Sequence, residues 1–300
     1  MPLVCLTDFQ AQARERLPKA SWDFIEGASD EGITMRDNMA AFKKIRLRPR
    51  YLKDVSQVDT GTTIQGEAIS APICIAPTAF HCIAWPDGEM STARAAQAAG
   101  VCYITSTYAS CTLEDIVASA PSGLRWFQLY VQPDWQLNKQ LIQRAESLGF
   151  KALVVTVDVP IIGKRRDDLR NQIDLKANLR LKTLQSPDEA KAVPSSLLAA
   201  MNAFFCWDHI PWLQSLTQLP IILKGILTRE DAELAVKHNV QGILVSNHGG
   251  RQLDEVPASG EKGVEEVLNI LKEEFRTSMT LTGCRSIAEI NRDLIQLSRL

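Results

Sequence analysis

The sequence predicts an α/β fold of the TIM type, a (β/α)8 barrel, with helices before it. Six short apolar runs alternate with amphipathic segments, which is the pattern of parallel strands covered on both faces. Nearly every run ends in a residue that can bind or react, and barrel enzymes build their sites from such strand ends. The alternative, a doubly wound sheet, gathers its ligand contacts at one switch point. Neither G-x-G-x-x-G after a strand nor G-x-x-x-x-G-K-[ST] is present.

Composition excludes several function classes. The 300 residues are 45% apolar and 23% charged with net charge −2, so no basic field invites nucleic acid or an acidic membrane. No apolar run approaches the roughly 20 residues of a membrane helix. The N-terminus becomes charged at Arg14 and Glu15, which argues against a signal peptide. Seven cysteines without a Cys-x-x-Cys pair suggest reduced thiols in an intracellular protein, with no disulfide framework and no metal site.

We expect one domain over residues 1–300, and its first part, 1–65, to be mainly helical. Thr7 and Asp8 can cap a helix that includes Phe9 and Leu17. A second helical stretch follows, with apolar residues at Trp22, Phe24, Ile25, Met39 and Phe42.

The barrel is expected over 66–259, and residues 260–300 form a last barrel helix and a tail. The expected strands are 73–77, 102–106, 125–131, 152–158, 221–225 and 242–249. Their C-terminal ends carry Thr78, Ser106, Gln128, Tyr130, Thr156, Asp158, Lys224, Ser246 and His248. Segment 161–211 has little strand character and is rich in charge. It fits a loop insertion after the fourth strand, as a mobile cover over the site.

The sharpest motif is SNHGGRQLD, residues 246–254. Gly249 and Gly250 permit a sharp turn just past a strand. His248 is a base that works near neutral pH, and Arg251 can hold a carboxylate through two hydrogen bonds. A surface turn with a solvated arginine is the plainer alternative, and two reactive side chains in one strand-end turn favour the functional interpretation.

Other candidates are weaker by pattern alone. Lys224, at the end of an apolar strand, needs an anionic partner unless it reaches out to solvent. Tyr130 and Gln128 share one face of their strand with Trp126, where core packing is equally plausible. The triplet 164–166, Lys-Arg-Arg, is typical of a solvated surface. The histidines outside the motif lack metal-like spacing and are interpreted as structural; they are His81, His209 and His238.

At SNHGGRQLDEVPAS the sequence resembles the FMN-dependent 2-hydroxy-acid oxidases and dehydrogenases, the glycolate oxidase family. The resemblance covers nearly the whole chain. It includes RLRPRYLKDV, IAPTAFHCIAWPDGEMSTARAA, FQLYV, TVDVPIIGKRR, PIILKGI and LTGCRSIAEI, in the family's order. Phe24 favours the long-chain branch, because glycolate-preferring relatives usually carry tyrosine there.

The resemblance implies a role for each matching residue. Pro77, Thr78 and Ala79 would line FMN, and Ser106, Gln128 and Thr156 would bind its ring system. Lys224 would stabilise negative charge on the ring. Tyr130, Arg165 and Arg251 would hold the substrate, with Phe24 beside it. His248 would remove a proton, and Asp158 would orient the resulting imidazolium. The products would be a 2-oxo acid and, from O₂, hydrogen peroxide.

One departure from the family is large. After VPAS the family continues through a helix, a strand ending in D-G-G-V-R, a second helix and a strand leading to G-R-P. This chain runs from Ser259 directly to GEKGVEEVLNILKEEF, which matches the family's last barrel helix. Two βα units of roughly 30 residues each are absent. The expected barrel is therefore incomplete, with about six of eight strands, and it lacks the turns that bind the flavin phosphate.

Two hypotheses share every motif: an active oxidase, and a family-derived chain that binds FMN poorly and is inactive or only an assembly partner. A third is another barrel enzyme, for instance a lyase that uses Lys224. Ser298, Arg299 and Leu300 resemble the S-K-L peroxisomal address, so an import receptor is an expected partner. The family also implies a homo-oligomer, a tetramer.

Overall fold

A computed structural model describes residues 2–43, 45–171, 204–256 and 275–297. Six parallel strands form one open sheet in the order β4-β5-β6-β7-β8-β9. Their bounds are β4 (Cys74–Ile75), β5 (Cys102–Thr105), β6 (Arg125–Leu129), β7 (Leu153–Thr156), β8 (Ile221–Ile226) and β9 (Gly242–Val245). The strands follow one another in chain order, as in a TIM barrel. The expected incomplete barrel is thus confirmed. Five strands are one to four residues shorter than the pattern indicated, and β8 is one residue longer.

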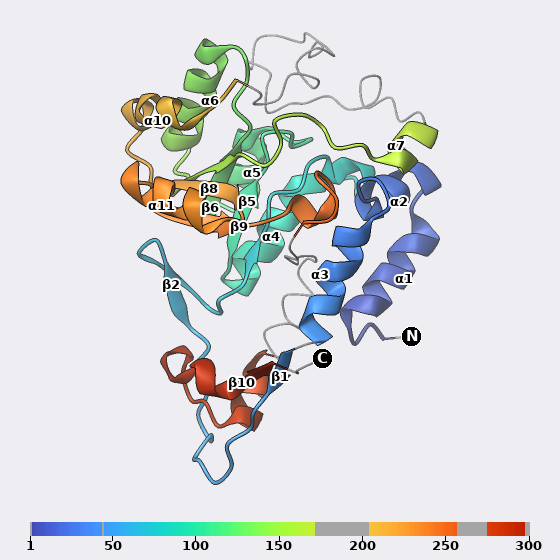
Figure 1. Cartoon of the computed structure of the whole chain (residues 1–300), viewed down its shortest axis with the longest axis vertical. Coiled ribbons are helices and arrows are strands. Elements are labelled where there is room, and N and C mark those ends of the chain that lie inside the picture. Colours follow the sequence, from blue (N-terminus) through green and yellow to red (C-terminus); the bar gives the residue numbers. More distant parts are fainter. Residues whose placement is uncertain (1, 44, 172–203, 257–274, 298–300) are drawn as a thin grey trace.

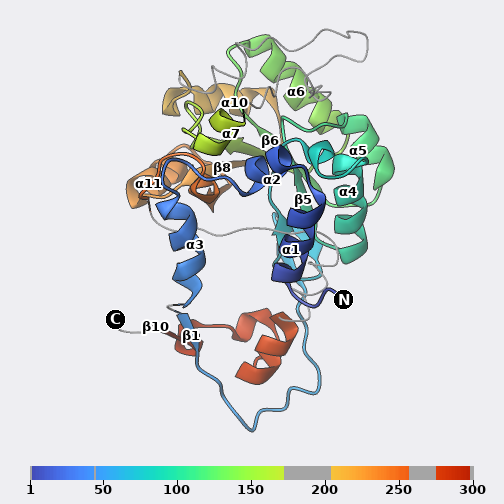
Figure 2. The same cartoon turned by 90° about the vertical axis from the view of Figure 1, so that its right-hand side faces the viewer.

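Helices connect the strands and cover the outer side of the sheet (Figures 1 and 2). They are α4 (Gly88–Ala99), α5 (Leu113–Ser119), α6 (Trp135–Ser147), α10 (Ile210–Leu216) and α11 (Arg229–Lys237). Three of them begin at side chains that accept the unpaired amides of the first turn: Thr112, Asp134 and Thr228. The local sequence therefore fixes where these helices begin.

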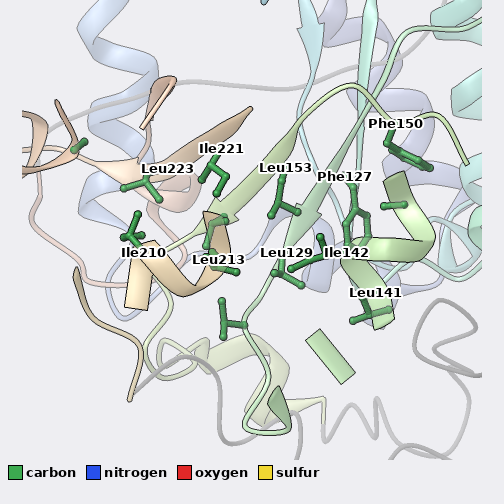
Figure 3. Packing of buried hydrophobic residues seen from close by; sticks show 14 of the residues in the cluster. Phe127, Leu129, Leu141, Ile142, Phe150, Leu153, Ile210, Leu213, Ile221 and Leu223 are labelled. Carbon is green, nitrogen blue, oxygen red and sulfur yellow. The ribbon is translucent and has the colours of Figure 1, made fainter. Parts of the chain in front are cut away.

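The main core lies between the sheet and its outer helices (Figure 3). Strand residues with one parity point outward, and they meet the apolar faces of α6 and α10. Figure 3 shows Phe127, Leu129, Leu153, Ile221 and Leu223 from the strands, and Leu141, Ile142, Ile210 and Leu213 from the helices. Residues of the other parity form a second cluster on the inner face, which includes Ile104, Trp126, Val154 and Ile222.

The last strand of the sheet, β9, is more exposed to solvent than the central strands, as expected for an open edge. Strands β5, β6 and β7 are buried throughout, but β9 alternates, and Val245 is 60% exposed. The sequence predicted strands covered on both faces. At β9 that expectation is wrong, because β9 is the last strand of this sheet within the described residues and no neighbouring strand pairs with its outer edge there.

The N-terminal part contains α1 (Leu6–Arg16), α2 (Lys19–Glu26) and α3 (Ile33–Lys43). The predicted cap of α1 is wrong by two residues: Cys5 is the cap, and Asp8 reaches back to accept the amides of Val4 and Cys5. Met39 and Phe42 are exposed. Phe24 is buried.

Short strands follow the helices and lie apart from the main sheet. They are β1 (Ile45–Leu47), β2 (Thr62–Ile64) and β3 (Glu67–Ile69), and β2 pairs with β3 as a hairpin. Residues 275–282 are helical, and β10 (Ile295–Leu297) pairs with β1. This C-terminal part lies beside β1 at the bottom of the molecule in both views (Figures 1 and 2).

Segment 161–211 is less irregular than predicted where it is described. It contains α7 (Arg166–Arg170) and the 3₁₀ turn η3 (Trp207–His209), and α10 begins at its end. Residues 172–203 of the predicted mobile cover, which was expected over 161–211, lie outside the described residues. No helix in the described part of the chain is long and apolar enough to span a membrane.

Candidate active site

A row of polar side chains lines the inner face of the sheet at its C-terminal edge. Each stands two residues beyond an apolar residue of the inner cluster, and the period-2 alternation of a strand therefore keeps it on the same face. Gln128 is central. Its carbonyl oxygen accepts from Ser106 Oγ (3.3 Å), and its amide donates to Thr156 Oγ1 (3.0 Å). All three side chains are buried.

Lys224 lies next to this row on β8 and is only 5% exposed. Its ammonium donates to Ser246 Oγ at 2.9 Å, the one side-chain contact that the described residues give it. A buried ammonium usually has a carboxylate or another anion beside it. The alternative in which this lysine reaches out to solvent is therefore excluded, and its positive charge favours an anionic group in the site.

His248 and Asp158 form a hydrogen-bonded pair. His248 Nδ1 lies 2.8 Å from Asp158 Oδ1, so Nδ1 carries the proton and Nε2 offers a lone pair. Nε2 faces the hydroxyl of Tyr130 at 3.3 Å. Burial lowers the pKa of His248 below its ordinary 6.5, although the bond to Asp158 opposes this, and the charge of Lys224 lowers the pKa further. The imidazole is therefore neutral near pH 7 and able to accept a proton.

Backbone conformation brings this pair together. Gly225 has φ +111°, and a Cβ there would lie 2.6 Å from Asp158 Cβ, so only glycine permits the approach. His248 itself has φ +59°, in the left-handed region that non-glycine residues seldom adopt. Such strain costs of order 1–3 kcal/mol and persists where the surrounding structure holds it.

The turn η4 (His248–Gly250) is held against α3. Gly250 packs so closely that a Cβ would lie 2.6 Å from the amide nitrogen of Met35. Asn247 and Asn38 exchange two side-chain hydrogen bonds of 2.8 and 3.1 Å, and both are buried. Asp254 accepts the amides of Ile33 and Thr34. The N-terminal helices thus position the reactive turn.

Two arginines lie beside the histidine. Arg251 donates to the carbonyl oxygens of Gly27 (2.6 Å) and Ile25 (3.3 Å), and its guanidinium lies 5.3 Å from the centre of the Phe24 ring. Arg165 Nε donates to the carbonyl oxygen of Arg251 at 3.4 Å. Burial, followed by the charge of Arg165, lowers the pKa of Arg251 to about 9. Two half-buried guanidiniums that lie close together favour an anion beside them.

Asp168 is the nearest anion, and sequence reasoning missed it. Its carboxylate lies 3.9 Å from Arg165 Nη1, and burial raises its pKa despite the two arginines. Its other oxygen is buried without a hydrogen-bond partner among the described residues. The spacing of Arg165 and Asp168 across one turn of α7 was the available signal.

Aromatic rings form the wall next to the arginines. Phe24, Phe80, Tyr108 and Tyr130 pack in sequence, with ring centroids 5.9, 6.4 and 5.2 Å apart. Burial raises the pKa of Tyr130 well above its ordinary value of 10, so its hydroxyl stays protonated. The remaining predicted residues, Pro77, Thr78 and Ala79, follow β4 directly, and Thr78 is exposed.

The structure therefore brings most sequence-predicted residues to one edge of the sheet. The residues of the triplet 164–166, interpreted from pattern alone as a solvated surface, lie in different surroundings. Arg165 is in the site, whereas Arg166 forms salt bridges with Asp30 and Glu31. Ser246, which bridges Lys224 and the amide of His248, has a positioning role that the sequence did not reveal.

Comparison with known proteins shows the family of the chain. The model of the FMN-dependent dehydrogenase family matches residues 13–259 and 256–297.

The chain belongs to the FMN-dependent dehydrogenase family.

2-Hydroxyacid oxidase 2 from Homo sapiens is 62% identical over 353 aligned positions that span 100% of both chains. 2-Hydroxyacid oxidase 1 from Homo sapiens is 37% identical over 361 positions, with 99% and 98% covered. Within the family the chain is therefore most like the 2-hydroxyacid oxidase 2 branch, and the family's cofactor is FMN.

Solved structures of the family share the fold. A soluble mutant of the membrane-associated (S)-mandelate dehydrogenase from Pseudomonas putida has a TM-score of 0.92 and 28% identity, covering 99% of this chain and 100% of that one. Mandelate oxidase with (S)-4-hydroxymandelic acid has a TM-score of 0.87 and 31% identity, with 99% and 100% covered.

The comparisons also locate the missing segment. The alignment with human 2-hydroxyacid oxidase 2 has 353 positions and this chain has 300 residues, so at least 53 positions (353 − 300) have no counterpart here. The two stretches that match the family model meet at 256–259. This is the point, just after Ser259, at which the sequence departs from the family's order.

Proposed function

We propose that this chain carries the site of an L-2-hydroxy-acid oxidase, which converts its substrate to a 2-oxo acid and passes the electrons through FMN to O₂, giving hydrogen peroxide. The observation that carries the proposal is the combination of a neutral, carboxylate-bonded His248 with the half-buried arginines Arg165 and Arg251 on one side. A base beside an anion-binding pair suits a substrate that has a hydroxyl next to a carboxylate.

The arginines hold the substrate's carboxylate. Arg251 is fixed by two carbonyl oxygens and by the face of Phe24, so little conformational entropy is lost when it binds. Tyr130 supplies a protonated hydroxyl next to His248 Nε2, and this hydroxyl is placed to donate to the substrate. Asp168 lies 3.9 Å from Arg165 and helps to position that guanidinium.

His248 Nε2 removes a proton from the substrate, and Asp158 supports the imidazolium that forms. The 2.8 Å hydrogen bond keeps the ring in the tautomer that presents Nε2. Asp158 Oδ2 is buried and has no hydrogen-bond partner among the described residues, so the carboxylate's charge is directed mainly at the histidine.

The polar row fits the ring end of FMN. Ser106, Gln128 and Thr156 offer alternating donors and acceptors, which match a flat heterocycle with both kinds of atom. Lys224 supplies a buried positive charge. Pro77, Thr78 and Ala79 would line the same ring from the end of β4. When bound, FMN would accept the two electrons that leave the substrate.

The phosphate end has no comparable support. In TIM barrels a phosphate is frequently held by the loops after strands 7 and 8. Within the described residues the sheet stops at its sixth strand, β9. Charge-assisted hydrogen bonds contribute about 1.5–3 kcal/mol each, so three lost contacts weaken FMN by about 5 kcal/mol, more than a thousandfold. We therefore propose weak FMN binding by this chain, with low activity.

The test compares this chain with a version that carries the missing segment of human 2-hydroxyacid oxidase 2, inserted between Ser259 and Gly260. FMN affinity is measured by quenching of flavin fluorescence, and peroxide and 2-oxo acid are measured with saturating FMN. We expect tight FMN binding and full turnover in the extended chain only. A parent chain that binds FMN stoichiometrically would overturn the phosphate proposal. An extended chain that holds FMN but oxidises no 2-hydroxy acid would overturn the proposed function.

Finer features are proposed on the same basis. Phe24 contributes an apolar ring beside Arg251, which suits a medium- or long-chain substrate, and a series of substrates of increasing length tests this.

We propose peroxisomal import through Ser298, Arg299 and Leu300, which lie outside the described residues, and a homotetramer by family likeness. Light scattering of the extended chain tests the tetramer.

A further inference from the structure

A second cluster of reactive side chains lies away from the polar row. Cys82 belongs to the turn η1 (His81–Ile83), Glu89 lies in the first turn of α4, and Cys111 lies in the loop between β5 and α5. We propose that Cys82, Glu89 and Cys111 form a binding site for one thiophilic divalent ion, of which Zn²⁺ is the physiological example. The sequence predicted no metal site, because its cysteines are scattered and form no Cys-x-x-Cys pair.

The geometry is close to that of a metal site. The two sulfurs and one carboxylate oxygen all lie within 4.8 Å of one another. Three such atoms fit within a circle of about 2.8 Å radius, whereas Zn²⁺ needs about 2.3 Å to sulfur and 2.0–2.2 Å to oxygen. Each ligand atom therefore has to move by about half an ångström, which side-chain rotation supplies.

Glu89 is fixed before any ion arrives. Its carboxylate is fully buried and accepts three backbone amides, those of His81 (3.0 Å), Ser110 (2.9 Å) and Cys111 (3.1 Å). These bonds hold η1 and the loop after β5 on either side of the carboxylate, and each of those two segments carries one of the thiols. The ligand set is therefore held by backbone bonds that do not depend on the ion.

Gly88 leaves the space between the thiols. Its φ is +48°, and a Cβ at this position would lie 2.6 Å from Cys82 Sγ and 3.5 Å from Cys111 Sγ. The two sulfurs therefore lie against Gly88, and any larger residue at this position would displace them. They lie near the carbonyl oxygens of Pro86 (3.5 Å) and Asp87 (3.6 Å), which accept from the thiols while these are protonated.

Charge and access are compatible with a soft cation. Two thiolates and a carboxylate carry three negative charges, which suits a divalent ion that prefers sulfur and excludes Mg²⁺ and Ca²⁺, whose preferred ligands are oxygens. Cys82 is exposed, so an ion can enter from solvent, and a water molecule can complete a tetrahedron. Burial and the charge of Glu89 raise the pKa of the Cys111 thiol to about 12, and binding must therefore release its proton.

A bound ion would join the segments that follow β4 and β5. Those two strands also lead to Pro77, Thr78, Ala79 and Ser106. The ion would therefore restrain the loops that carry these candidate active-site residues. This consequence does not depend on the proposed oxidase function. It predicts that metal raises the melting temperature of the chain even without flavin.

The experiment titrates the full-length chain with Cd²⁺, followed by the ultraviolet thiolate-to-cadmium band, and repeats it with Zn²⁺ in competition with a chromogenic chelator. Native mass spectrometry gives the stoichiometry. Cys82→Ser is the main variant, since its thiol is exposed and its loss does not endanger folding. Cys111→Ser and Glu89→Gln remove the other ligands. Cys206→Ser is the matched control, because Cys206 is also exposed and also lies beside a possible ligand, His209 Nδ1, at 3.3 Å.

We expect one tightly bound ion with a two-thiolate band and a melting temperature raised by several degrees. Cys82→Ser should weaken binding by at least about 100-fold, and Glu89→Gln by about 10-fold or more, whereas Cys206→Ser should retain the tight site. The proposal is overturned if the parent chain binds no ion at micromolar concentration. It is equally overturned if Cys82→Ser binds as the parent does, or if the tight site is lost with Cys206.

Discussion

Asp254 connects the reactive turn to α3, and its substitution has a consequence that can be worked out. The carboxylate accepts the amides of Ile33 (3.2 Å) and Thr34 (2.8 Å), which are first-turn donors without a partner inside the helix. Asp254 thus caps α3 from a point more than 200 residues away in sequence. The change considered is Asp254→Asn, which keeps an acceptor oxygen and removes the charge.

The magnitude follows from the pKa. Burial raises the pKa of Asp254, but the amide bonds outweigh it and bring the pKa from 3.8 to about 2. A difference of nearly two units corresponds to at most about 2.5 kcal/mol, and the side chain is only half-buried, so we expect about 1–2 kcal/mol. Because the folded-state pKa is depressed, this stabilisation is complete above pH 3.8 and is lost as the pH falls through about 2.

Urea unfolding at pH 7 and at pH 2 measures the effect, and hydrogen exchange at 246–256 shows whether the turn loosens. At pH 7 the Asn variant should unfold at lower urea concentration than the parent, and the difference should shrink at pH 2. Asp37→Asn, on the exposed side of the same helix, controls for the change of net charge. Equal midpoints at pH 7, or a difference that persists unchanged at pH 2, would refute the capping role.

Three further predictions concern the site, and a fourth concerns the targeting signal. His248→Gln should lower turnover of 2-hydroxy acids by about 10²–10⁴-fold in the extended chain with bound FMN, and near-normal turnover would remove His248 from the mechanism. Because the pKa of His248 is lowered, kcat/KM should fall on the acid side at a pH below 6.5, and a midpoint above 6.5 would contradict the neutral base. Lys224→Met should weaken FMN by about 10–100-fold without lowering the melting temperature of the flavin-free chain, and a lower melting temperature would mean that Lys224 stabilises the apoprotein. Deleting Leu300 should leave a fluorescent fusion in the cytosol, whereas an unchanged punctate pattern would place the address elsewhere.

Local patterns in the sequence were sufficient for the fold. Apolar runs such as 152–158 and 221–225 predicted buried parallel strands, and the structure has strands at both. Strand ends predicted the site, because every parallel strand delivers its C-terminal residue to the same edge. The roles of these residues came from the family resemblance and remain proposals, since periodicity alone could not separate Gln128 from a core residue.

Other features depended on residues that meet from distant parts of the chain. Asp168 could be recognised as part of the site only from its position beside Arg165 in the folded chain. The different surroundings of Arg165 and Arg166 arise because Asp30 and Glu31 form salt bridges with Arg166. The Cys82 and Cys111 pair is 29 residues apart, and the folding of two neighbouring βα turns brings its thiols together.

The sequence by itself determined the strand and helix pattern, the family and the position of the missing segment. All of these rest on spacing along the chain, which a linear pattern records. Only the tertiary structure decided the tautomer of His248, the burial of Lys224 and the exposure of β9. Each of these depends on which distant groups surround a side chain and exclude water from it. Burial and hydrogen bonding are properties of that surrounding space, and residues adjacent in sequence do not specify them.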